Sequence, residues 1–145
     1  LDNVNALLSF AYSLLASDCA AALEGAGLDP YVGFLHRARP GRRSLALDLM
    51  EELRTVLADR FVLSCINQKV LNAKHFEKQE NGAILLTEEG RRAFLNAWQQ
   101  KKREVITHPF LKEKLCWGLV PYVQALLLAR TLRGDLEVYP PFFWK

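Results

Sequence analysis

The sequence contains little cysteine, and this scarcity narrows the classes of protein that it can encode. Its three cysteines, Cys19, Cys65 and Cys116, are widely spaced and form no Cys-x-x-Cys pair. Neither a disulfide framework nor a zinc ribbon is therefore expected. The cysteines lie among apolar residues, so we expect reduced, buried thiols in a cytoplasmic protein.

The sequence also lacks the signatures of several enzyme classes and of membrane proteins. It has no Ser-His-Asp order, no phosphate-binding Walker loop and no dinucleotide-binding glycine pattern. No signal peptide is visible, and the apolar run at 126–129 is far too short to span a bilayer. We therefore expect no membrane partner.

The composition is that of a globular domain. Of the 145 residues 50% are hydrophobic and 24% are charged, which suits one domain with its own core. The net charge of +3 is too small to establish nucleic-acid binding by itself. Because the chain starts at Leu1 and enters a helical pattern almost at once, we expect a fragment of a longer protein.

Apolar residues at helical spacing predict a mainly α, multi-helix domain over residues 1–134. The last helical stretch is expected to bend near Gly118 and Pro121 and to close at Gly134. Asn, Ser, Asp and Thr residues stand where the helices should begin. The expected helices cover about residues 3–25, 44–57, 59–70, 87–105 and 109–133.

Two segments depart from the helical pattern. Residues 75–86 predict one small β-hairpin that turns at Asn81-Gly82, a strong two-residue turn signal. Residues 135–145 contain Tyr139-Pro140-Pro141 and further aromatics, and they predict an extended tail. These aromatics must dock on this domain, on a partner or on another part of the protein. Elsewhere, Phe94, Trp98, Phe110 and Trp117 are expected in the core.

Acidic residues and one histidine form the candidate site. Asp48 lies three residues before Glu51 and four before Glu52, so each pair shares a helix face. His36 precedes this helix, and one imidazole with carboxylate oxygens suits Mn²⁺ or Mg²⁺. The alternative is a surface histidine beside a solvated acidic helix face, and spacing alone does not decide between them.

Basic residues surround this candidate site. The loop between His36 and Asp48 contains four arginines that suit the phosphates of a DNA backbone, and its alternative is an ordinary solvated loop. On the acidic helix Arg54 is positioned to pair with Glu51 and to orient that carboxylate. The arginines of the loop are Arg37, Arg39, Arg42 and Arg43.

Four blocks of the sequence resemble one known family, the CRISPR-associated Cas1 endonucleases, which are the integrases of CRISPR adaptation. The blocks are residues 5–12 (NALLSFAY), 27–36 (GLDPYVGFLH), 44–54 (SLALDLMEELR) and 133–141 (RGDLEVYPP). Together they place all 145 residues in that family's C-terminal helical domain. They are similar to the branch found with compact type I systems, type I-C.

The resemblance implies roles for particular residues. His36 matches the histidine of the family's metal site and Glu51 matches its final acidic ligand, while Asp48 matches a supporting acidic position. The remaining glutamate of that site would lie upstream of Leu1, with the family's N-terminal β-domain. The resemblance therefore implies that this chain alone binds Mn²⁺ weakly and has little activity.

The resemblance also implies a function and partners. These are metal-dependent cleavage and transesterification of double-stranded or branched DNA that insert new spacers into a CRISPR array, by a homodimer that works with Cas2. Two alternatives remain open, which are a non-catalytic DNA-holding domain and a purely structural domain for oligomerisation or docking.

Overall fold

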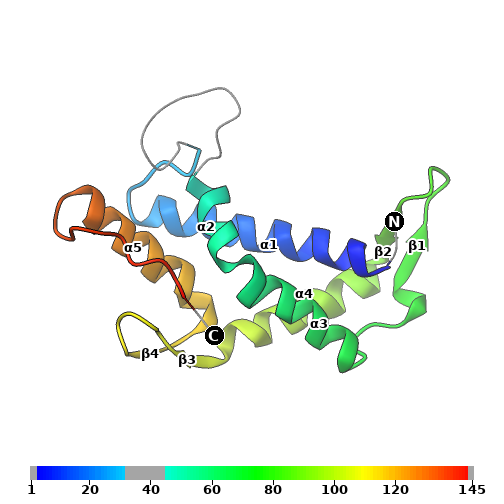
Figure 1. The fold of residues 1–145 in the computed structure, drawn as a ribbon. Helices are drawn as coiled ribbons and strands as arrows, with labels where there is room; N and C mark the ends of the chain where they lie inside the picture. The colour runs from blue at the N-terminus through cyan, green and yellow to red at the C-terminus, as the bar shows by residue number, and fades with distance from the viewer. Residues whose placement is uncertain (1–2, 32–44, 144–145) are drawn as a thin grey trace.

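The computed structural model describes residues 3–31 and 45–143 as a mainly α-helical fold with two small antiparallel strand pairs. The β1–β2 pair lies at one end of an elongated molecule and α5 at the other (Figure 1). The elements are α1 (Asn3–Gly25), α2 (Leu45–Leu53), a π-helical segment (Arg54–Asp59), α3 (Arg60–Asn67), β1 (Phe76–Lys78), β2 (Ile84–Leu86), α4 (Glu88–Arg103), β3 (Val105–Thr107), β4 (Lys114–Cys116) and α5 (Val120–Leu132).

Helix α1 is the long helix on which the others assemble. Its buried residues recur at helical spacing, and α2 and α5 pack against it. By length and composition alone α1 could cross a membrane, but here its buried stripe belongs to the hydrophobic core. That stripe comprises Leu7, Ala11, Leu15, Cys19, Ala22 and Leu23.

The helix after α2 continues where the sequence predicted a restart. The π-helical segment Arg54–Asp59 joins α2 directly to α3, and the Asp59 side chain makes no capping hydrogen bond. Helix α3 thus begins directly after Asp59, as expected, but Asp59 is itself helical and its carboxylate accepts a hydrogen bond from Tyr12 on α1 instead of capping α3. The third helix ends at Asn67, short of the expected Val70. The predicted cap at Ser44 lies outside the described residues.

The predicted hairpin at residues 75–86 is confirmed. Strands β1 and β2 pair in antiparallel register, with Phe76 opposite Leu86 and Lys78 opposite Ile84. Gly82 has φ +86° at the turn, a conformation that glycine adopts without a steric cost. The backbone N–H of Ala83 donates to the Asn81 side chain, which fixes the turn locally.

Helix α4 begins as expected and ends earlier. The Thr87 side chain accepts a hydrogen bond from the Gly90 backbone N–H, so the predicted cap is confirmed. The helix ends at Arg103, and Val105, which was expected on its inward face, belongs to strand β3 and is exposed. The β3–β4 pair is a second hairpin that the sequence analysis missed, since its strands are only three residues long and carry weak alternation.

The last helix is shorter than predicted, and the two residues at which a bend was expected lie at or before its first turn. Helix α5 starts at Val120, and Pro121 occupies its first turn, where a missing N–H costs no hydrogen bond. Gly118 lies in the short 3-10 turn before it. Gly134, at φ +88°, follows the end of α5 as expected.

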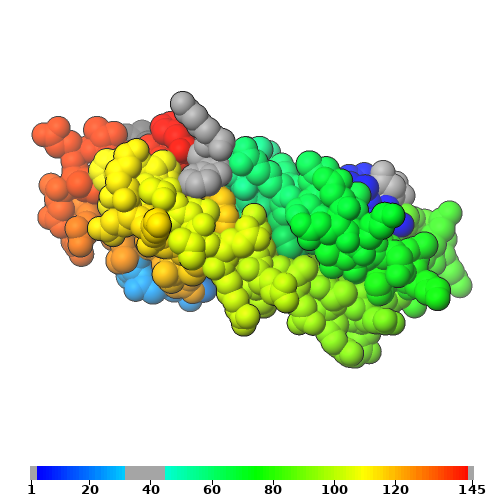
Figure 2. Space-filling model, turned by 90° about the horizontal axis from the view of Figure 1, so that it is seen from below, coloured from blue at the N-terminus to red at the C-terminus, as the bar shows by residue number. Residues whose placement is uncertain are grey.

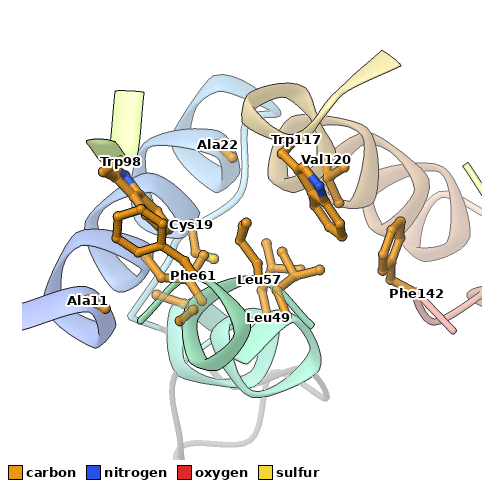
Figure 3. Packing of buried hydrophobic residues seen from close by; sticks show 14 of the residues in the cluster. Ala11, Cys19, Ala22, Leu49, Leu57, Phe61, Trp98, Trp117, Val120 and Phe142 are labelled. Carbon is orange, nitrogen blue, oxygen red and sulfur yellow. The ribbon is translucent and has the colours of Figure 1, made fainter. Parts of the chain in front are cut away.

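Aromatic rings flank the centre of the core, where Leu49 and Leu57 lie between Phe61 and Trp98 on one side and Trp117 and Phe142 on the other (Figure 3). Phe61 lies 5.0 Å from Phe94 and 5.1 Å from Trp98, measured between ring centroids. Trp117 is also buried, so three of the four expected core aromatics are confirmed. Phe110 was expected in the core and is half exposed, because it lies in the turn between β3 and β4.

The C-terminal tail packs on the domain. Phe142 is only 3% exposed, and its ring lies 5.7 Å from that of Trp117 (Figure 3). In the space-filling view the tail runs beside the β3–β4 hairpin (Figure 2). The next aromatic, Phe143, is 76% exposed, so the tail docks through some of its aromatics and presents others to solvent.

Candidate functional site: the carboxylates of α2

Helix α2 places its acidic residues at the border between core and solvent. Leu45, Leu49 and Leu53 bury one side of the helix, and a helical rotation of about 100° per residue turns the other side outward. Glu51 is exposed and Asp48 is half buried. The two residues thus share the accessible edge that their spacing predicted.

Arg54 contacts the Glu51 carboxylate. Its Nη1 lies 3.7 Å from Glu51 Oε1, and both side chains are more than a third exposed. An exposed pair of this length contributes little to stability. The pair does limit the directions that the Glu51 side chain takes.

A tyrosine on α1 holds Arg54 from the other side. The Arg54 guanidinium carbon lies 5.6 Å from the centre of the Tyr12 ring. The Tyr12 hydroxyl donates to Asp59 Oδ1 at 2.5 Å. This hydrogen bond, with burial, raises the pKa of Tyr12. Residues from both ends of the π-helical segment therefore meet one ring on α1, and such segments often mark functional positions.

Glu52, next to Glu51, has a different environment. Its carboxylate accepts from the Phe142 backbone N–H at 2.6 Å, from Gln124 Nε2 at 2.9 Å and from the Tyr139 hydroxyl at 2.9 Å. Burial raises the pKa of Glu52, and these hydrogen bonds oppose that rise by stabilising the carboxylate. The Glu52 carboxylate is therefore hydrogen-bonded to other residues of the protein, whereas Glu51 faces solvent.

Gln124 connects Glu52 to a buried histidine. His108 Nδ1 accepts the backbone N–H groups of Phe110 and Leu111, both at 3.1 Å. This leaves the proton on Nε2, which donates to Gln124 Oε1 at 2.7 Å. Both His108 and Gln124 are 0% exposed. His108 directly follows strand β3 in the chain.

Several of the predicted site residues lie outside the described residues. These are His36 and the loop arginines Arg37, Arg39, Arg42 and Arg43, so their distances to α2 remain predictions. Among residues 3–31 and 45–143, no group of three or more His, Cys, Asp and Glu side chains is arranged to hold a metal ion. Asp48 and Glu51 nevertheless supply the hard oxygen donors that Mn²⁺ and Mg²⁺ prefer.

Sequence reasoning missed Glu52, Gln124 and Tyr139 as one cluster. A signal was present at Glu52, because it lies three residues after Leu49 and seven after Leu45, at the edge of the buried stripe. A charged residue at such a position needs a buried partner. Its partners are 72 and 87 residues away in the chain, which no local pattern reveals.

The fold and these carboxylates define a helical domain that presents an acidic helix edge to solvent. Residues 1–100 match the family described as "CRISPR associated protein Cas1". The chain is 61% identical over 145 residues to "CRISPR-associated endonuclease Cas1 2" of Rhodospirillum rubrum, covering 100% of this chain and 42% of that protein. The chain belongs to the Cas1 family. Its type I-C branch remains a prediction.

Solved structures agree with this assignment. The fold matches a structure titled "Casposase bound to integration product" with a TM-score of 0.83 and 30% identity, over 99% of this chain and 42% of that one. It also matches a "Partial Cas6-RT-Cas1--Cas2 complex" with a TM-score of 0.74 and 28% identity, over 100% and 42% of the two chains. The chain thus spans about two fifths of the length of these relatives.

Proposed function

We propose that the protein containing this chain is a metal-dependent DNA endonuclease and integrase that inserts new spacers into a CRISPR array. The observation that carries the proposal is the 61% identity to a named Cas1 endonuclease across all 145 residues. The accessible edge of α2, with Asp48 and Glu51 side by side, supports it as the place where the chemistry occurs.

In this proposal His36, Asp48 and Glu51 hold a divalent ion, Mn²⁺ or Mg²⁺, together with a ligand from outside this chain. The ion supplies Lewis-acid polarisation of the scissile phosphate. The arginine side chains of the 37–43 loop bind the flanking phosphates and fix the DNA register. Arg54, whose Nη1 lies 3.7 Å from Glu51 Oε1, restrains that carboxylate.

The reaction is an exchange of phosphate esters. The 3′-hydroxyl of the incoming DNA attacks phosphorus, forms a new P–O bond and gives up its proton. The P–O bond to the leaving 3′-oxygen breaks, and that oxygen gains a proton. Water in place of the attacking hydroxyl gives hydrolysis, so one site supports both integration and nuclease activity.

The partners are proposed from the matched structures. One solved relative is titled as bound to integration product and another as a complex with Cas2. We infer that the protein binds double-stranded or branched DNA, forms a homodimer and assembles with a Cas2 protein in the cytoplasm. The chain tested alone is expected to bind Mn²⁺ weakly, because Asp48 and Glu51 provide few ligands by themselves.

The test uses the intact protein and branched DNA. His36→Ala and Glu51→Gln are each expected to abolish Mn²⁺-dependent cleavage and strand transfer while leaving DNA affinity within about twofold, since neither removes a cation that binds phosphate. Glu80→Gln, in the exposed β1–β2 turn, is the matched control and should retain both activities. Unchanged activity in both site variants would remove the metal-site assignment.

A non-catalytic DNA-holding role is the second candidate. It is favoured by the four arginines at positions 37–43 of the sequence, which suit the phosphates of a DNA backbone whether or not a metal ion is bound. It predicts that His36→Ala changes no activity, while substitution of the loop arginines lowers DNA affinity and the slope of affinity against salt concentration. The same set of variants therefore separates the two functions.

A further inference from the structure

The C-terminal tail is hydrogen-bonded to the acidic helix through Glu52. The Tyr139 hydroxyl lies 2.9 Å from each Glu52 oxygen, and the Phe142 backbone N–H donates to Oε1 at 2.6 Å. These tail residues lie 87 and 90 positions from Glu52 in the sequence. The tail therefore acts as a strap that ties α2 to the far end of the chain.

The strap is fixed by further buried groups. Gln124 Nε2 lies 2.7 Å from the Tyr139 hydroxyl, 2.9 Å from Glu52 Oε1 and 3.2 Å from the Pro140 carbonyl oxygen, and donates among these acceptors. Its Oε1 accepts from His108, as described above. Every buried side-chain polar atom in the described residues has a hydrogen-bond partner, so the cluster holds one arrangement.

The strap also has an apolar anchor. Phe142 is 3% exposed, and its ring lies 5.3 Å from His108 and 5.7 Å from Trp117. Burial of such a ring favours the docked state of the tail. The hydrogen bonds to Glu52 are directional. They therefore form at one rotation of α2 about its axis, which the burial of Phe142 alone would not select.

Helix geometry links this anchor to the candidate ligands. Glu52 is one turn after Asp48, about 40° away around the helix axis, and Glu51 lies about 60° from Asp48 on the other side. Fixing Glu52 therefore fixes the rotation of α2 and the directions of both other carboxylates. The anchor sits directly before the π-helical segment Arg54–Asp59, where the regular helical repeat changes.

We propose that Glu52 is a positioning residue, and that the strap of residues 139–142 sets the orientation of Asp48 and Glu51 through it. This inference rests on the proposed function, since it concerns the same metal site. Glu52 binds no metal in this scheme. It acts by fixing the orientation of α2. The C-terminal tail thereby contributes to the geometry of the metal site.

The test compares substitutions on both sides of this contact in the intact protein. Glu52→Ala removes all the acceptors, Glu52→Gln keeps the shape and one oxygen, and Tyr139→Phe removes a single donor. Tyr31→Phe is the matched control, because the Tyr31 side chain is 78% exposed. Each variant is measured well below its own thermal midpoint, with Mn²⁺ alone as the probe.

Two measurements are made on each variant. Electron paramagnetic resonance titration gives the Mn²⁺ dissociation constant and the spectrum at saturation, and amide hydrogen exchange without metal reports the α2 backbone. Glu52→Ala is expected to weaken Mn²⁺ binding about tenfold or more, the usual effect of losing a group that supports a ligand. Tyr139→Phe should give a smaller loss, Glu52→Gln a partial rescue relative to Glu52→Ala, and α2 exchange should accelerate in the same order.

The outcomes separate this inference from the proposed function. If Glu51→Gln weakens Mn²⁺ binding but Glu52→Ala leaves the dissociation constant and α2 exchange unchanged, the positioning role is wrong and the metal site stands. If Glu52→Ala lowers only the thermal midpoint, Glu52 is merely structural and the inference is again wrong. If His36→Ala and Glu51→Gln both retain full Mn²⁺ affinity, the metal site fails and the positioning role falls with it.

Discussion

The guanidinium of Arg54 lies over the ring of Tyr12, with 5.6 Å between its central carbon and the ring centroid. The same guanidinium reaches Glu51 at 3.7 Å, and the Tyr12 hydroxyl donates to Asp59. One aromatic residue on α1 thus braces both ends of the π-helical segment that follows the candidate site. The acidic edge of α2 is supported from two sides, by Tyr12 and by the C-terminal strap.

Tyr12→Phe tests the first of these supports. The substitution keeps the ring under Arg54 and removes the hydrogen bond to Asp59, so we expect a loss of about 1–2 kcal/mol in the free energy of unfolding. Chemical denaturation measures it, with Tyr31→Phe as the control that should stay within about 0.5 kcal/mol of wild type. Equal stability of the two variants would show that the Asp59 contact contributes nothing.

Gln124→Leu tests the buried cluster. It leaves His108 Nε2 without its acceptor and removes a donor from Glu52, and each unpaired buried group costs about 1–3 kcal/mol. We expect a loss of about 3 kcal/mol in the same denaturation measurement. Gln99→Leu, at an exposed position of α4, is the control. A loss no larger than that of the control would contradict the cluster's role in stability.

Gly90→Ala tests a close approach between α4 and the segment before β1. An added Cβ would lie 2.6 Å from the His75 carbonyl oxygen and 2.7 Å from the His75 Cβ. Alanine normally stabilises a helix by about 1 kcal/mol relative to glycine. Here we expect the opposite sign, a destabilisation of about 1–3 kcal/mol from overpacking. A higher thermal midpoint than wild type would show that the backbone moves away at little cost.

Thiol reactivity tests the burial of the cysteines. Cys19 and Cys65 are buried and Cys116 is partly exposed, so brief alkylation of the native protein should label Cys116 first, as read by mass spectrometry. Burial raises the pKa of Cys65 from 9.0 to about 11. The stability due to this shift is present below pH 9.0 and is lost as the pH rises through about 11. Equal labelling of all three thiols would contradict the packing of α1 and α3.

Local sequence patterns correctly predicted the elements that are stabilised by contacts between residues close in the sequence. The Asn81-Gly82 turn fixes its geometry with a positive φ and one side-chain hydrogen bond, and Thr87 caps α4 three residues ahead. The 3.6-residue period of apolar side chains predicts α1 for the same reason. These features depend on neighbours within a few residues, which the sequence displays directly.

The sequence by itself determined the mainly helical fold, the small hairpin at 75–86 and the family, and it placed Asp48 and Glu51 on one helix face. Only the tertiary structure decided that Asp59 continues a helix instead of starting one, that Val105 enters a second hairpin, and that Glu52 turns inward. The reason is physical. A buried carboxylate is stable only where hydrogen-bond donors offset the cost of its desolvation. The donors to Glu52 belong to Gln124, Tyr139 and Phe142, and only folding brings these residues to it.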